Sequence, residues 1–175
     1  AASDVYKRQM QVMNCTTPAN YFHALRRQMH RDFRKPLIIM TPKSLLRHKH
    51  CTSNLVDFSK KNSFHRILWD HAMDPKLKGF IKLKKIKKIK KVILCSGKIY
   101  FDLLEEREKL KRDDVVFFRI EQLYPFPAKT LAEELKPYSK NANFYWCQEE
   151  PKNMGAWFSV RDYIQWTLDN IKASN

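Results

Sequence analysis

Three neighbouring residues, His48, His50 and Cys51, have the chemistry of metal ligands. Residues two apart on an extended backbone point to the same side, so His48 and His50 could face one ion. A zinc site needs four ligands, or three with an open position, and no second cluster lies at a suitable spacing. His65 and His71 are loose candidates only. We therefore assign no metal-ligating residue.

Glu149 and Glu150 form a carboxylate pair directly after a predicted strand, where ligands bind in open α/β sheets. Adjacent residues of an extended chain diverge, so these two carboxylates cannot flank one scissile bond as paired hydrolase acids do. We expect a structural role for the pair. The carboxylates would cap the helix that begins near Gly155 or bond to a neighbouring domain.

Ser96, Gly97 and Lys98 follow another predicted strand and could hold an anion on free backbone N–H groups. One glycine beside a lysine is a weak signal, and a tight turn is the default interpretation. The three glycines of the chain, Gly79, Gly97 and Gly155, lie too far apart for the GxGxxG, P-loop or GxSxG motifs. We name no catalytic and no cofactor-binding residue.

Residues 76–91 contain nine lysines and no acid, in a chain with 34 Lys+Arg, 18 Asp+Glu and a net charge of +16. Clustered lysines neutralise phosphates, so a small basic nucleic-acid-binding module is one hypothesis. The run contains a single aromatic residue, Phe80, which gives base stacking little support. We favour a solvated linker that leads into a strand, with lysine stems covering apolar surface.

Residues 122–127 alternate aromatic residues with prolines, which favours an extended, stiff connection that presents its rings outward or across an interface. Tryptophans nearby add apolar area, and such a concentration predicts docking against another domain or subunit. The alternative is that the rings fill the local core. The predicted interface residues are Tyr124, Phe126, Glu149, Glu150, Gly155 and Trp157.

The elements that position these groups alternate between strands and helices. Continuous apolar runs predict strands at 92–95, 115–120 and 144–147. Amphipathic patterns predict helices at 100–111, 127–136 and 157–171. Within the first of these helices, Leu103, Leu104 and Leu110 are expected to face inward. The alternation predicts a three-layer α/β/α domain with a mostly parallel sheet.

A helix and a strand are also predicted before this domain. Thr17 is placed as an N-cap, followed by Pro18 in the first helical position. The segment 37–40 is a short apolar run, typical of a strand buried on both faces. Residues 42–75 are interpreted as a connection with one short helix. The apolar stripe of the predicted helix consists of Phe22, Leu25, Met29 and Phe33.

Cysteine spacing and hydropathy indicate the compartment. The four cysteines form no CxxC pair, the N-terminus lacks a signal-peptide core, and no run of about 18 apolar residues could span a membrane. We expect a cytoplasmic protein with no membrane contact. Residues 1–9 lack an initiator Met and look like a translated sequencing adapter, so we expect a non-native tail there. Both ends look cut, which predicts a fragment of a longer protein.

Four strings in natural order carry a family resemblance: PLIIMTPKSLLRH at 36–48, CSGKIY at 95–100, RIEQLYPFP at 119–127 and WCQEEPKNMGAW at 146–157. From about Met10 onward the chain resembles the C-terminal region of the thiamine-diphosphate-dependent first component of the 2-oxoglutarate dehydrogenase complex, bacterial type. The resemblance implies three parts. Residues 10–48 would end a transketolase-like pyrimidine-binding domain, 49–90 would be a linker with the lysine-rich run, and 91–175 a truncated transketolase C-terminal-like domain.

The resemblance also implies an activity for the parent enzyme. The family decarboxylates 2-oxoglutarate on thiamine diphosphate with Mg²⁺ and transfers the succinyl unit to the lipoyl group of a succinyltransferase, and the subunit forms a homodimer. A sister enzyme specific for 2-oxoadipate stays open. The family's Gly-Asp-Gly motif is absent, and its active-site residues lie upstream, so we transfer no catalytic, cofactor-binding or metal residue. We expect the fragment to be inactive alone, to hold no cofactor and to supply packing surface.

Overall fold

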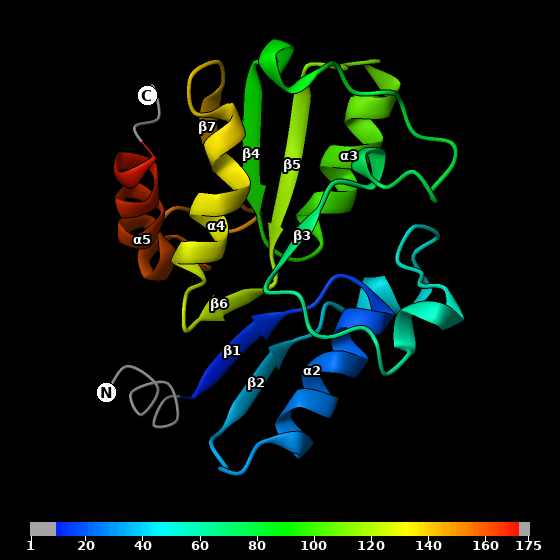
Figure 1. Cartoon of the computed structure of the whole chain (residues 1–175), viewed down its shortest axis with the longest axis vertical. Helices are drawn as coiled ribbons and strands as arrows, with labels where there is room; N and C mark the ends of the chain where they lie inside the picture. Colours follow the sequence, from blue (N-terminus) through cyan, green and yellow to red (C-terminus); the bar gives the residue numbers. More distant parts are fainter. Residues whose placement is uncertain (1–9, 172–175) are drawn as a thin grey trace.

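The computed structural model describes residues 10–171 as two sheets that lie end to end (Figure 1). The tail expected at 1–9 lies outside the described residues. No helix in the described part of the chain is long and apolar enough to cross a lipid bilayer. The α/β architecture expected from the alternating pattern is confirmed.

The larger sheet has four strands in the order β3-β5-β4-β7. The central strand β4 runs parallel to β5 on one side and to β7 on the other, whereas β3 is antiparallel to β5. The prediction of a mostly parallel sheet is therefore correct, and β3 is an addition to it. Its strands are β3 (Ile67–Trp69), β4 (Lys91–Cys95), β5 (Val115–Ile120) and β7 (Asn143–Cys147).

Helices cover both faces of the larger sheet, which gives the predicted three layers (Figure 1). Helix α3 (Ile99–Lys109) packs on one face, where Tyr100 and Phe101 are fully buried. Helices α4 (Ala128–Leu135) and α5 (Trp157–Asn170) pack together over the other face. Each fully buried Leu or Phe side chain contributes about 1.5–3 kcal/mol, so both clusters stabilise the sheet that they sandwich.

Helix α3 departs from its predicted boundary. Leu104 is buried as expected and Leu103 is half-buried, but Leu110 is 60% exposed. The helix ends at Lys109, and Lys111 adopts a left-handed backbone conformation with φ 51°. Leu110 therefore lies beyond the last helical turn, outside the buried stripe, and its predicted inward position is wrong.

The smaller sheet joins two strands near the N-terminus to a strand that follows β5. Its order is β2-β1-β6, with β1 parallel to β2 and antiparallel to β6. Helix α2 (Pro18–His30) connects β1 to β2, and Thr17 accepts the Asn20 N–H at its N-terminus as predicted. The strands are β1 (Gln11–Asn14), β2 (Leu37–Met40) and β6 (Gln122–Tyr124).

The prediction of a buried apolar stripe on α2 is wrong for the described residues. Phe22, Leu25 and Met29 are 41%, 45% and 72% exposed, and the helix instead buries Ala24 and three other residues. The prediction that β2 is buried on both faces is also wrong. Ile38 and Met40 are 42% and 47% exposed, whereas Leu37 and Ile39 on the other face are partly buried. The described residues supply covering side chains to only one face of this small sheet.

The connection between the two sheets contains short 3₁₀ turns rather than one helix. Residues 76–91 run mostly as an extended loop over the surface, and Ile89 is buried where the loop enters β4. Backbone hydrogen bonds tie this loop to Asp113 and Asp114. The 3₁₀ turns of this connection are η1 (Lys43–Arg47), η2 (Leu55–Phe58), η3 (His71–Met73) and η4 (Ile86–Lys88). A further 3₁₀ turn, η5 (Lys136–Tyr138), follows α4.

Candidate functional site

A buried carboxylate joins the N-terminal unit to the larger sheet. Glu121 follows β5 and has no exposed surface. Its Oε2 accepts the backbone N–H of Thr16 at 2.9 Å and the side-chain amide of Asn20 at 2.9 Å, and its Oε1 accepts the Thr16 hydroxyl. Because an unpaired buried carboxylate is costly, these donors fix the β1–α2 turn against the end of β5.

Arg119 lies on the other side of the same threonine. Its guanidinium donates to the Thr16 hydroxyl at 3.1 Å and to the Trp69 carbonyl at 2.6 Å, and it lies 4.2 Å above the Tyr100 ring. The threonine hydroxyl therefore bridges Arg119 and Glu121. Burial raises the pKa of the Glu121 carboxyl, and the charge of Arg119 and the donors from Thr16 and Asn20 oppose that rise.

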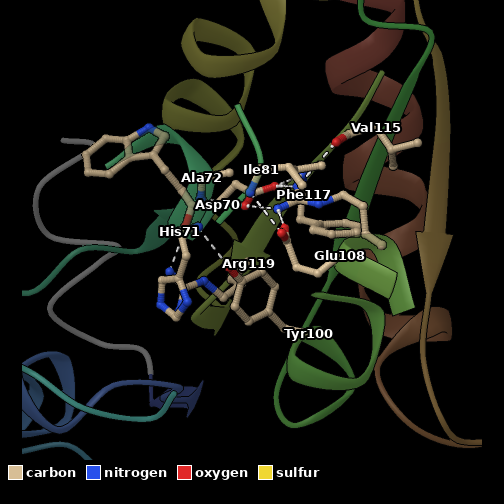
Figure 2. Close-up of polar contacts among 11 residues, drawn as sticks. Asp70, His71, Ala72, Ile81, Tyr100, Glu108, Val115, Phe117 and Arg119 are labelled. Atoms are coloured by element: carbon tan, nitrogen blue, oxygen red, sulfur yellow. Dashed lines mark hydrogen bonds and ion pairs between the residues drawn. The ribbon is translucent and has the colours of Figure 1, made fainter. Parts of the chain in front are cut away.

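Asp70 and Arg107 form a buried ion pair, and Figure 2 shows Asp70 in the same group of polar contacts as Arg119. Arg107 reaches both carboxylate oxygens, at 3.0 Å for Nη2 to Oδ1. Asp70 also accepts the backbone N–H groups of Ala72 at 2.9 Å and of Phe117 at 3.1 Å. The pair thus ties the end of β3 to α3 and β5, with nearly every polar atom of the carboxylate satisfied.

His71 is buried close to Arg107 and Arg119. Its backbone N–H donates to the Tyr100 hydroxyl at 2.9 Å (Figure 2). Its ring contacts Phe80 and Tyr100 at centroid distances of 5.3 Å. Burial, followed by the charges of Arg119, His50 and Arg107, lowers the pKa of His71 to about 3. His71 is therefore a neutral imidazole at physiological pH.

The turn at Ser96, Gly97 and Lys98 is closed by neighbouring side chains. Gly97 has φ +75°, and a Cβ there would collide with the side-chain amide of Asn14. The Ser96 hydroxyl donates to the Ile120 carbonyl at 2.9 Å. Lys98 pairs with Glu149 at 2.7 Å and with Asp102 at 3.2 Å. The structure agrees with the tight-turn interpretation, since the lysine is already neutralised.

Gln148, which the sequence reasoning missed, organises the loop between β7 and α5. Its Oε1 accepts the indole N–H of Trp146 at 2.9 Å and the backbone N–H of Trp157 at 3.1 Å. Its amide group donates to three carbonyls of the same loop. Gln148 therefore provides the helix-end contact expected of the glutamates, whereas Glu150 packs on Gly155, where a Cβ would lie 2.8 Å from Glu150 Oε2.

The predicted interface rings have different environments. Phe126 is 9% exposed and stacks on Tyr163 at 5.3 Å, so its ring is part of the core of this chain. Tyr124 is 36% exposed on β6. Trp157 is half-buried and stacks on Trp146 at 6.4 Å. Tyr124 has the most ring surface available to a partner.

The loose metal candidates do not converge. The Nδ1 of His48 accepts the His50 backbone N–H at 3.2 Å, and Cys51 donates its thiol to the Thr16 carbonyl at 3.2 Å. Within residues 10–171, no group of three or more His, Cys, Asp or Glu side chains could hold a metal ion. Burial raises the pKa of Cys51 and of the fully buried Cys95, which are therefore protonated thiols.

The fold and its buried network define a class of protein. A mostly parallel sheet covered on both faces, joined to a β-α-β unit, fits the α/β domains of transketolase-like enzymes. The family described as "2-oxoglutarate dehydrogenase C-terminal" matches residues 52–175, and "Transketolase, pyrimidine binding domain" matches residues 6–49. The chain belongs to the 2-oxoglutarate dehydrogenase C-terminal family, which confirms the resemblance inferred from its sequence strings.

Curated relatives agree with this assignment. The chain is 62% identical over 166 residues to the 2-oxoglutarate dehydrogenase E1 component of Brucella abortus (strain S19). It is 61% identical over the same length to the proteins of that name from Brucella ovis and Brucella canis. Each match covers 95% of this chain and 16% of the relative, so the chain spans about a sixth of the length of these relatives.

Proposed function

We propose that this chain is the C-terminal part of a 2-oxoglutarate dehydrogenase E1 component. The full-length protein would decarboxylate 2-oxoglutarate and pass the succinyl unit to the lipoyl group of a succinyltransferase partner. The observation that carries the proposal is the 62% identity over 95% of the chain to a protein of that name. The sister activity towards 2-oxoadipate is the alternative, because substrate recognition would lie in other parts of the enzyme.

Within the full-length enzyme, the chain would serve as a packing element. We propose that residues 10–48 end the pyrimidine-binding domain, that 49–90 link it to the next domain, and that 91–175 form the C-terminal domain. The bonds from Thr16 and Asn20 to Glu121 support this role, since they cross from the first part to the third. The interface would include Tyr124, with Glu149, Glu150, Gly155 and Trp157 near the β7–α5 loop.

Thiamine diphosphate, when bound, supplies the carbanion that attacks the 2-oxo acid. The residues that the structure describes do not fit that group. Gly97 packs on Asn14 and Gly155 packs on Glu150, so neither glycine leaves an open backbone cradle for a diphosphate. The described residues also offer no cluster of metal ligands for Mg²⁺. We therefore place both groups in other parts of the full-length enzyme and derive no reaction step from them.

The assembly would be a homodimer in the cytoplasm that docks to the lipoyl-bearing succinyltransferase. Family membership favours this assembly over the nucleic-acid-binding hypothesis. Part of the lysine run is already neutralised, because Lys84 pairs with Asp113 at 2.9 Å. The remaining lysines fit the solvated surface of a linker.

The test is an activity assay on the full-length polypeptide. With thiamine diphosphate and Mg²⁺ present, 2-oxoglutarate should reduce an artificial electron acceptor, and omission of thiamine diphosphate should abolish the reaction. Residues 10–171 expressed alone should show no activity above buffer. A full-length enzyme that is inert towards 2-oxoglutarate but active on 2-oxoadipate would move the assignment to the sister enzyme.

A further inference from the structure

Residues 76–91 pass from the side of α3 to the amino-terminal edge of the larger sheet, where β4, β5 and β7 begin (Figure 1). Backbone hydrogen bonds hold this loop in place. The Lys84 N–H donates to the Asp113 carbonyl at 2.9 Å, and the Lys90 N–H donates to the Asp114 carbonyl at 2.9 Å. The edge that the loop reaches is the end of the larger sheet farther from the smaller sheet (Figure 1).

Apolar side chains between the lysines anchor the loop to the core. Phe80 packs against the cluster under α3, whereas Leu83 and Ile89 pack in the cluster on the other face of the larger sheet. With these residues held inward, the lysines face solvent, and all nine lysines of the loop are exposed. The loop thus presents a row of ammonium groups from a hydrogen-bonded backbone.

Most of these lysines have no acidic partner. Within residues 10–171, Lys84 is the only lysine of the loop in an ion pair, with Asp113 at 2.9 Å. Further exposed lysines lie on the connections that precede β5 and β7, and η4 of the loop contacts η5 beside them. Like charges held this close repel one another, so the potential there is positive and attracts a polyanion. We name as the basic edge the nine lysines of residues 76–91 together with Lys111, Lys136 and Lys140.

The composition of the basic edge favours carboxylates over the other anionic macromolecules. Phe80 is the only aromatic residue in the loop and is half-buried, so nucleic-acid bases have no free ring on which to stack. Arg112, beside the loop, pairs with Asp114 at 2.9 Å, so its guanidinium is not free to hold a phosphate through two hydrogen bonds. Ile86 is the only exposed large apolar side chain of the loop, which leaves little to insert into a lipid bilayer. A flexible chain of carboxylates needs neither rings nor apolar anchors.

We propose that the basic edge binds an acidic, unstructured segment of a protein partner, with carboxylates at alternate positions. The backbone at Ile89 is extended, with φ −71° and ψ 129°, and its side chain is 2% exposed. Lys88 and Lys90 therefore lie together on the opposite side, roughly 7 Å apart. Glutamates at every second position of an extended peptide repeat at the same distance, so successive carboxylates meet successive ammonium groups. This surface does not depend on the proposed decarboxylase activity.

Binding measurements on the full-length protein test the proposal at about 0.15 M salt, where charges farther apart than roughly 8 Å are screened. The probes are a peptide with glutamate at every second position and a thymidine oligonucleotide of the same net charge, both followed by fluorescence anisotropy, and phosphatidylserine vesicles followed by co-sedimentation. We expect the peptide to bind most tightly, and a roughly threefold rise in salt concentration to weaken its binding about tenfold. An oligonucleotide or a vesicle that binds as tightly as the peptide through the same lysines would overturn the proposal.

Variants separate the basic edge from general attraction to a basic protein. The combined variant Lys85→Gln, Lys88→Gln and Lys90→Gln should weaken peptide binding about tenfold, because three surface charge contacts are lost. Replacing the same three lysines by arginine should retain the binding, since the charge is kept. The control removes the same net charge from exposed lysines outside the basic edge and combines Lys60→Gln, Lys61→Gln and Lys152→Gln.

The substituted side chains should leave the fold intact. All six are exposed and lie outside the ion pairs found within residues 10–171, so the thermal unfolding midpoints should match that of the unaltered protein. Equal peptide affinity of the two glutamine variants would overturn the proposal. So would an unaltered protein that does not bind the peptide.

Discussion

Thr16 and Glu121 are 105 residues apart in sequence, and the Thr16 backbone N–H donates to the Glu121 carboxylate at 2.9 Å. The hydroxyl of the same threonine donates to Glu121 and accepts from Arg119. One side chain therefore satisfies two buried charged groups at once. The turn that begins α2 is held by a carboxylate at the end of β5, and loss of the hydroxyl affects both charges.

Thr16→Val should destabilise the protein by about 2 to 3 kcal/mol, because Arg119 and Glu121 would each lose a buried partner. Thr167→Val is the matched control, since Thr167 is equally buried and donates only to the Tyr163 carbonyl within α5. The control should cost about 1 kcal/mol or less. Urea unfolding followed by tryptophan fluorescence measures both changes, and similar losses in the two variants would contradict the bridging role of Thr16.

Arg107→Leu should destabilise the protein by about 3 to 5 kcal/mol, because it leaves the Asp70 carboxylate buried and unpaired. Adding Asp70→Asn should recover part of that loss, since asparagine removes the unpaired charge and its single amide oxygen can still accept one of the two N–H groups, of Ala72 or of Phe117. A double-mutant cycle on unfolding free energies should give a coupling above about 1 kcal/mol. Lys109→Leu, at an exposed pair with Glu106, is the control and should leave the unfolding midpoint unchanged. Additive single-variant effects would argue against the pair.

Gly97→Ala should destabilise the protein more than Gly79→Ala does. Both glycines have positive φ, but a Cβ at Gly79 meets nothing within 4 Å, whereas one at Gly97 collides with Asn14. Gly79→Ala should therefore cost only the backbone strain of about 1 kcal/mol. Combining Gly97→Ala with Asn14→Ala should remove most of the difference. Thermal unfolding measures it, and a Gly97→Ala variant no worse than Gly79→Ala would show that the turn tolerates a side chain.

His71 should make stability fall as the pH is lowered. Its pKa is about 3 in the folded protein and 6.5 when unfolded, so the unfolded state binds more protons between these values. Lowering the pH from about 7 to 5 should cost about 2 kcal/mol through this group alone. His71→Phe should remove that part of the slope, whereas His30→Gln, at an exposed position, serves as the control. An unchanged slope in His71→Phe would contradict the prediction.

The sequence predicts the central part of the fold well, because β4, β5 and β7 are continuous apolar runs between amphipathic helices. It does not predict β1, β3 or β6. These strands are three or four residues long, and their pairing depends on distant segments rather than on their own pattern. The apolar stripe predicted on α2 is wrong because Phe22 and Leu25 remain 41% and 45% exposed, although the Phe22 ring contacts Phe58.

The buried network was harder to predict than the fold. Lys98 and Glu149 were each singled out from local patterns, but their ion pair joins turns about 50 residues apart. Thr16 and Asn20 could not be singled out from the local sequence, because Thr and Asn are common residue types at the N-terminal ends of helices. Arg119 is the residue from which part of the network could have been predicted. It is a charged residue inside the fully buried strand Val115–Ile120, and a buried charge requires a partner. Burial of that strand could be predicted, whereas the identity of the partner could not.

The antiparallel pairing of β1 with β6 holds the N-terminal segment to the part of the chain that follows the connection in the native protein. Lys60 and Lys61 are exposed in a turn between η2 and β3, so trypsin can reach the chain there. A molecule nicked at this site should remain a noncovalent heterodimer of its two peptides on gel filtration and should come apart only in denaturant. Recombining the separately made peptides would then reconstitute the fold, which offers a route to label each half with different isotopes.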